Sequence, residues 1–191
     1  MSNLKGTKTL RNLMEAFAGE SQARNRYSYY SSIAKNEGYV EIANIFAETS
    51  DHEKEHAKRI FKFLKDSGQN VEITGSFPTV MGSTADNLKS AAQGENHEWK
   101  EMYPTFAKIA KEESLNEIAA VFSSIAVAEQ YHERRYKKLL DRVQSSKVFK
   151  SDSSVTWKCQ NCGFIHEGTG APEKCPACAH AKAHFMILAE A

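Results

Sequence analysis

Apolar residues recur at steps of three and four along four long stretches of the chain, which is the spacing that places side chains on one face of a helix. The first stretch runs from about Thr7 to Asn36 and is followed by Gly38, which can adopt the left-handed conformation that stops a helix. The second stretch runs from about Val40 to Asp66. These two stretches predict a pair of long helices joined by a tight turn.

Residues 67–84, which follow the second stretch, are rich in Gly and Thr and too long for a tight turn. A connection of this length lets the third helix begin at the same end of the bundle as the second. We expect the third helix to have Asp86 as its N-cap, and the fourth to begin at a capping box of Ser114 and Glu117 and to end near Gln144. The predicted fold is mainly α, a ferritin-like four-helix bundle with one long crossover.

The second and fourth stretches each carry a Glu-x-x-His pair in the middle of the apolar face, Glu53 with His56 and Glu129 with His132. Residues three apart lie side by side on a helix, so each pair presents a carboxylate next to an imidazole. A charged carboxylate that is buried without a partner costs several kcal/mol, so we expect each pair to coordinate a cation. A solvated helix face is the alternative for a single pair, but here both pairs have apolar neighbours.

The two pairs belong to an internal repeat, because Phe46 precedes the first pair by the same spacing as Phe122 precedes the second. A repeat that contributes one Glu-x-x-His from each half builds a two-metal site between the halves. The first and third helices add carboxylates on their own apolar faces. The predicted ligands are Glu20, Glu53, His56, Glu95, Glu98, Glu129 and His132. Such a carboxylate-rich set without sulfur suits iron or manganese.

The repeat changes register within the third helix. The spacing from Glu95 to Tyr103 is longer by a single position than the corresponding spacing from Glu20 to Tyr27. We predict that the helix absorbs the extra residue as one wide turn, a π-bulge, and the rival explanation is a kink at Pro104.

The sequence predicts further roles for three side chains, Glu98, Tyr27 and Tyr103. Glu98 is a fifth carboxylate, beyond the four that balance two ferrous ions, so it favours the more oxidised metals and allows a ligand to exchange. Tyr27 and Tyr103 lie two turns beyond the carboxylates. They are predicted to donate hydrogen bonds to bridging carboxylates or protons to a bound oxidant, and buried core tyrosines are the alternative.

The cysteines form two Cys-x-x-Cys pairs, separated by a short loop, close to the end of the chain. They are Cys159, Cys162, Cys175 and Cys178. Two such pairs build a tetrahedral sulfur site, which is too small to fold without its metal. In isolation this module favours structural zinc, but beside a di-metal site a one-electron iron centre is favoured because it has something to reduce. We predict domains at residues 1–146 and 157–191, with a polar linker at 147–156.

Composition and charge limit the remaining possibilities. The 191 residues allow one good core and a small appendage, and 41% hydrophobic with 26% charged residues is typical of a globular protein. No apolar run approaches the length of a membrane span. A formal net charge of +1 without a basic block argues against a nucleic-acid partner. The first residues lack the apolar core of a secretory signal, so we expect a cytoplasmic protein.

The combination and order of these motifs resemble the rubrerythrin family over essentially the whole chain. The resemblance implies a di-iron site at the seven Glu and His positions and one iron in a rubredoxin-like domain at the four cysteines. It also implies a non-haem peroxidase of oxidative-stress defence, with hydrogen peroxide as substrate and electrons from NAD(P)H through a reductase or rubredoxin. On reduction, the iron near Glu20 is expected to exchange Glu98 for His56. A head-to-tail homodimer is expected as well.

Two other functions remain open at this point. A ferritin-like ferroxidase or iron-handling protein would use the same carboxylates, although the four-cysteine module argues against it. A zinc-ribbon interaction protein on a helical scaffold would need no redox metal.

Overall fold

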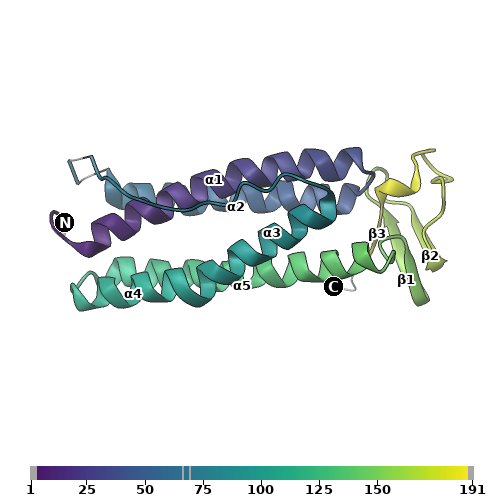
Figure 1. Cartoon of the computed structure of the whole chain (residues 1–191). Coiled ribbons are helices and arrows are strands. Elements are labelled where there is room, and N and C mark those ends of the chain that lie inside the picture. The colour runs from purple at the N-terminus through teal and green to yellow at the C-terminus, as the bar shows by residue number, and fades with distance from the viewer. Residues whose placement is uncertain (1–3, 66, 69, 189–191) are drawn as a thin grey trace.

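The fold is a helical bundle with a small sheet at one end, seen in a computed structural model that describes residues 4–65, 67–68 and 70–188 (Figure 1). The bundle contains α1 (Lys8–Asn36), α2 (Val40–Leu64), α3 (Thr84–His97), a π-helix η1 (Glu98–Met102), α4 (Tyr103–Glu112) and α5 (Asn116–Gln144). The small domain contains β1 (Lys150–Cys159), β2 (Ile165–Gly170), the 3-10 turn η2 (Lys182–His184) and β3 (Phe185–Ile187). The mainly α, ferritin-like prediction is confirmed.

The first hairpin and the crossover follow the predicted course. Thr7 is the N-cap of α1 and its side chain accepts a hydrogen bond from the backbone N–H of Leu10, while Gly38 has φ +84° after the last turn. α2 ends at Leu64, and the predicted end at Asp66 lies outside the described residues. The crossover runs back along the bundle, so α3 begins at the end where α2 begins (Figure 1).

Both predicted caps in the second half of the bundle were wrong. Ser83 is the N-cap of α3, and Asp86 is its capping-box partner, whose carboxylate accepts from the Ser83 backbone N–H at 3.1 Å. Ser114 does not cap α5, because its φ of +63° makes it the left-handed stop of α4. Its N–H bonds the Lys111 carbonyl and the next N–H bonds the Ala110 carbonyl, the two bonds of a Schellman motif.

The predicted wide turn is confirmed as the π-helix at Glu98–Met102. The backbone N–H of Tyr103 donates to the carbonyl of Glu98, five residues earlier. Pro104 lies in the first turn of α4, where a proline without an N–H is tolerated. The helical direction therefore continues from α3 into α4, and the extra residue is absorbed next to Glu98.

Two apolar clusters fill the bundle on either side of its middle. One includes Leu13, Ile60 and Phe122, and the other includes Ile42 and Phe46. Between these clusters lie four buried carboxylates, one on each of α1, α2, α3 and α5: Glu20, Glu53, Glu95 and Glu129. The polar groups therefore form one layer inside an apolar core. Apolar side chains therefore cover the layer toward both ends of the bundle.

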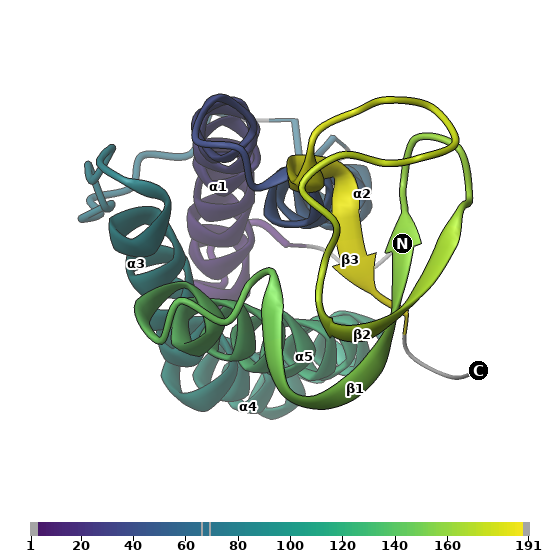
Figure 2. The ribbon, with the colours of Figure 1, turned by 90° about the vertical axis from the view of Figure 1, so that its right-hand side faces the viewer.

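The C-terminal domain is a three-stranded antiparallel sheet in the order β2-β1-β3. β1 begins at Lys150, so much of the segment predicted as a linker is a strand that pairs with β2. The domain packs on the end of the bundle near the start of α2 (Figure 2). There the Asn44 side chain donates to Gln160 Oε1 at 2.9 Å, and Arg142 of α5 donates to the Val148 carbonyl.

Candidate metal centres

The middle layer of the bundle collects six of the seven predicted carboxylate and histidine ligands. They are Glu20 from α1, Glu53 and His56 from α2, Glu95 from α3, and Glu129 and His132 from α5. The four carboxylates are at most 1% exposed and His132 is 2% exposed. Burial of so many ionisable groups in one layer requires compensating charge.

The six side chains form two clusters that share two carboxylates. In the first, His56 Nδ1 lies 3.0 Å from Glu53 Oε2, 3.0 Å from Glu129 Oε1 and 3.7 Å from Glu20 Oε2. Glu53 and Glu129 therefore each point one oxygen into this cluster, and Glu20 belongs to it alone.

The second cluster repeats this arrangement around the other histidine. His132 Nδ1 lies 2.7 Å from Glu129 Oε2, 3.4 Å from Glu53 Oε1 and 3.6 Å from Glu95 Oε2. Glu53 and Glu129 thus give one oxygen to each cluster, which is the arrangement of carboxylates that bridge two metal ions. Glu20 and Glu95 are the corresponding terminal carboxylates.

Within the part of the chain that the structure describes, several atoms in this layer lie near other polar atoms but form no hydrogen bond of good geometry. They are Glu53 Oε1, Glu95 Oε2, both carboxylate oxygens of Glu129 and His132 Nδ1. Buried polar atoms in native proteins are normally paired, and oxygen and nitrogen ligands bind a divalent cation at about 2.0–2.2 Å. Ligands at that radius lie roughly 3 Å apart, as these atoms do. The residues therefore fit two divalent cations, and their oxygen-rich composition suits iron.

The pKa values of these groups show how much negative charge a bound cation would compensate. Burial and the charge of Glu53 raise the pKa of Glu20 to about 7, and burial with the charge of Glu53 raises the pKa of Glu95 well above its usual value. Burial lowers the pKa of His132, but its contacts with Glu129, Glu53 and Glu95 outweigh this and raise it to about 12. Without a cation, the layer therefore retains protons in its place.

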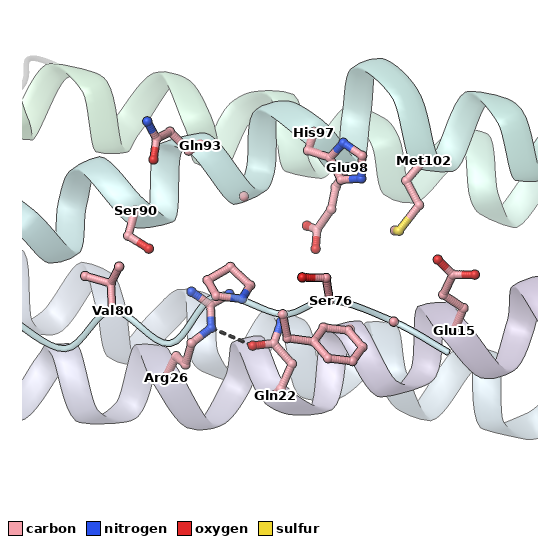
Figure 3. Close-up of a pocket in the computed structure, with 15 residues that line it drawn as sticks. Glu15, Gln22, Arg26, Ser76, Val80, Ser90, Gln93, His97, Glu98 and Met102 are labelled. Carbon is pink, nitrogen blue, oxygen red and sulfur yellow. Dashed lines mark hydrogen bonds between the residues drawn. The ribbon is translucent and has the colours of Figure 1, made fainter. Parts of the chain in front are cut away.

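Glu98 is the one predicted ligand outside both clusters. It begins the π-helix, is half-buried, and points its carboxyl group into a pocket beside the layer (Figure 3). Burial and the charges of Glu95 and Glu20 raise the pKa of its carboxyl group, so Glu98 interacts electrostatically with both clusters. His56 occupies the first cluster in this conformation.

The two tyrosines hold the terminal carboxylates, and not the bridging ones that we predicted. Tyr27 Oη donates to Glu95 Oε1 at 2.5 Å, and Tyr103 Oη donates to Glu20 Oε1. Burial and the nearby carboxylate charges raise the pKa of both phenols, so both remain protonated O–H donors. The choice of partner follows from the repeat, since each tyrosine reaches across to the carboxylate of the other half.

Two residues next to the site make contacts that support it. His52 lies with Nδ1 3.1 Å from His132 Nε2, and the two rings stack. Glu133 lies off the apolar face of α5 that carries the ligands, yet it is only 6% exposed. It accepts hydrogen bonds from Asn96 Nδ2 at 2.8 Å and Trp99 Nε1 at 2.7 Å, and so ties α5 to the π-helix. Its partners lie on another helix, so helical spacing alone could not identify it.

The four cysteines converge beside the C-terminal end of β1, the central strand of the small sheet. Cys159 Sγ lies 3.8 Å from Cys178 Sγ and Cys162 Sγ lies 3.7 Å from Cys175 Sγ, too far for disulfides. A tetrahedral metal with bonds of about 2.3 Å separates its sulfur ligands by roughly 3.8 Å. A backbone hydrogen bond from His180 lowers the pKa of Cys178 to about 6. The geometry therefore fits one tetrahedral metal.

Comparison with known proteins covers both parts of the chain. The profile of the rubrerythrin family matches residues 11–140, and that of the rubrerythrin rubredoxin-like domain matches residues 157–186. The chain is 54% identical to the rubrerythrin of Nitratidesulfovibrio vulgaris over 98% of both chains, and 55% identical to rubrerythrin-1 of Clostridium acetobutylicum over 100% of this chain and 99% of that one. A solved structure of nigerythrin in a mixed-valence state aligns with a TM-score of 0.64 at 30% identity, covering 98% of this chain and 94% of that one. Among the described helices, none is both long and apolar enough to cross a membrane.

Proposed function

Because the chain belongs to the rubrerythrin family of di-iron oxidoreductases, we propose that it is a peroxidase that reduces hydrogen peroxide to water in oxidative-stress defence, with electrons that originate from NAD(P)H. The observation that carries the proposal is the pair of clusters sharing Glu53 and Glu129. Two metal ions held side by side suit a two-electron reduction better than a structural role. The described residues around the site offer no other redox group.

The ligands in this proposal are assigned from the two clusters. Glu53 and Glu129, which give one oxygen to each cluster, would contribute to holding both ions, Glu20 and His56 would hold one of them, and Glu95 and His132 would hold the other. Glu98 would be the carboxylate that takes the place of His56 when the ions are oxidised. Iron held by this set would supply the electron pair that reduces a peroxide.

The chain's own part in the reaction is orientation and proton supply. Reduction of one hydrogen peroxide consumes two electrons and two protons and releases two waters. Tyr27 and Tyr103 fix the terminal carboxylates and keep their protons at neutral pH. We assign each tyrosine the delivery of one proton, and the apolar clusters on both sides keep bulk water out.

The four-cysteine domain is the proposed entry point for electrons, delivered by a separate reductase or rubredoxin. Asn44, which contacts this domain, lies nine residues before Glu53 on α2. Nine residues of helix span about 14 Å, so the cysteine site lies well beyond the di-metal layer of its own bundle. A head-to-tail homodimer places the cysteine domain of a second copy against the middle of the first. Unpaired cysteines also favour a cytoplasmic location.

The peroxidase proposal is tested with Glu53→Ala, measured as NADH-linked peroxide consumption with a reductase and rubredoxin supplied. The matched control is Glu55→Ala, because Glu55 lies two residues away on α2 and is exposed. Glu53→Ala should abolish peroxide reduction and keep the red colour of the sulfur-ligated iron, whereas Glu55→Ala should behave as wild type. Full activity in Glu53→Ala would overturn the assignment of the site.

Transfer between subunits is tested by refolding Glu53→Ala together with Cys159→Ser. If electrons cross between copies, a mixed dimer retains one intact route and regains activity. If they stay within one chain, a verified mixed dimer remains inactive, which would contradict the head-to-tail arrangement.

A further inference from the structure

A pocket of about 350 Å³ lies between α1, the junction of α3 with the π-helix, and the crossover (Figure 3). Residues 75–78 and Val80 form its roof, and the carboxyl group of Glu98 points into it. Phe77 and Val80 are 39% and 44% exposed, so the roof is a single layer of chain with solvent on its outer side. Tyr30 Oη donates to the Val80 carbonyl at 2.6 Å and ties one end of the roof to α1.

Two glycines keep this pocket open. Gly19 and Gly94 line it from α1 and α3, each directly before a terminal carboxylate, Glu20 or Glu95. Glycine weakens the interior of a helix, and a Cβ built at either position meets nothing within 4 Å. Gly19 is nevertheless buried, so the space beside it is internal. Any larger residue here would fill the pocket next to the ligands.

The pocket is far larger than hydrogen peroxide requires. A water occupies about 30 Å³ of liquid, so two oxygen atoms need roughly 60 Å³, whereas sites for small organic ligands begin near 300 Å³. Phe77, Pro78 and Met102 give the wall an apolar part. Arg26 is engaged by Gln22 Oε1 at 2.6 Å, and the lining also holds two carboxylates, so it does not favour an anion.

We propose that this pocket admits small neutral alkyl hydroperoxides to the di-metal site, and that Gly19 and Gly94 set its width. The inference rests on the proposed peroxidase function and extends its substrate class. The O–O bond of ROOH breaks, one oxygen leaves as the alcohol ROH and the other as water. Two protons are consumed, together with two electrons from the same ferrous pair that serves hydrogen peroxide.

The kinetic test uses tert-butyl hydroperoxide, whose six heavy atoms need roughly 180 Å³ on the scale of liquid water. Wild type should reduce both tert-butyl hydroperoxide and hydrogen peroxide. Gly94→Leu should lower kcat/KM for tert-butyl hydroperoxide at least tenfold more than kcat/KM for hydrogen peroxide, at equal iron content. Lys89→Leu, which adds the same side chain at an exposed position of α3, should leave the ratio unchanged. Gly19→Ala should give a smaller change in the direction of Gly94→Leu.

A binding measurement keeps the inference testable if Gly94→Leu does not fold. The full chain, loaded with redox-inert zinc and labelled at its methionine methyl groups, is titrated with tert-butyl alcohol, the product. The Met102 methyl resonance should shift saturably, whereas those of Met14 and Met186, which do not line the pocket, should not.

The outcomes separate the two proposals. If wild type reduces neither peroxide, the peroxidase function itself fails and the inference fails with it. If wild type reduces hydrogen peroxide alone, or if Gly94→Leu lowers both rates equally and Met102 does not respond to the alcohol, the pocket is not an entrance for alkyl hydroperoxides and the peroxidase function stands.

Discussion

Removal of the metals should make the stability of the bundle fall as the pH rises. The pKa of Glu20 is raised from 4.5 to about 7 by burial and by the charge of Glu53. Between these values the folded chain holds more protons than the unfolded chain, so the free energy of unfolding decreases with pH. One pKa unit corresponds to about 1.4 kcal/mol, so Glu20 alone accounts for a loss of roughly 3 kcal/mol between pH 4.5 and pH 7 and above.

The other groups of the layer act in the same direction. The pKa of Glu95 is raised by burial and by Glu53, and the pKa of His132 is raised to about 12 because the carboxylates outweigh burial. The stability that His132 contributes is complete below its unfolded pKa near 6.5 and is lost as the pH rises toward 12. Bound cations replace these protons, so the metal-loaded protein should instead gain metal affinity as the pH rises.

The assay is urea unfolding of the metal-free and metal-loaded protein at pH 5, 6, 7 and 8, followed by the helical circular dichroism of the bundle. The difference in stability between the two forms should widen with pH. Glu20→Gln provides the control, because it removes one titrating group and should flatten the slope of the metal-free form between pH 5 and pH 7. A metal-free bundle whose stability is constant or increases over this range would show that the buried carboxyl groups do not retain their protons in the folded chain.

Substitutions at Glu98, Glu133 and Tyr103 each test one contact. Glu98→Ala should retain two metals, because Glu98 lies in neither cluster, and its diferric state should be easier to reduce. Glu95→Ala should lose the metal of the His132 cluster, so equal metal loss in both variants by elemental analysis would contradict the distinction. Glu133→Ala leaves Asn96 and Trp99 without their acceptor and should lower the free energy of unfolding by about 1–3 kcal/mol in urea titrations, with a change below about 0.5 kcal/mol counting against it. Tyr103→Phe removes the O–H donor to Glu20 and should lower kcat at unchanged metal content, and an unaltered kcat would remove Tyr103 from the proton supply.

The long helices and the convergence of the ligands could be predicted because both depend on helical spacing. A carboxylate on an apolar face must lie inside a bundle, so Glu53 and Glu129 could be placed in the core before the fold was known. The π-helix followed from arithmetic, since one residue inserted into a repeat that keeps its phase has to be absorbed within a helix.

The structure differs from the prediction where two neighbouring residues could each cap a helix, or where contacts with residues far away in the sequence determine burial or pairing. Ser83 and Asp86 are both good N-cap residues, and their reciprocal capping box decides which one holds the cap. Ser114 cannot cap α5 while its positive φ closes α4. Glu133 accepts hydrogen bonds from Asn96 and Trp99, which lie outside its own helix, and the predicted linker becomes part of β1 because residues 150, 155 and 156 pair with β2. No pattern along one element contains that information.

The position of Glu98 shows the limit of spacing most clearly. Its backbone position places it beside the carboxylate layer, as predicted, but the direction of its side chain depends on the turn geometry of the π-helix and on the space beside it. In this structure the carboxyl group points into the pocket (Figure 3). His56 lies in the cluster, 3.0 Å from Glu129 Oε1.

An anaerobic peroxide titration of the fully reduced protein, with iron in both sites, shows where in the molecule peroxide is reduced. Reduction bleaches the red absorption of the iron at Cys159, Cys162, Cys175 and Cys178, and hydrogen peroxide in slight excess over the reducing equivalents should restore it rapidly in wild type. Glu53→Ala, with its sulfur-ligated iron intact, should remain bleached over the same time. If the colour returned at the same rate in this variant, peroxide would be reacting outside the carboxylate layer, and this layer would not be the site of reduction.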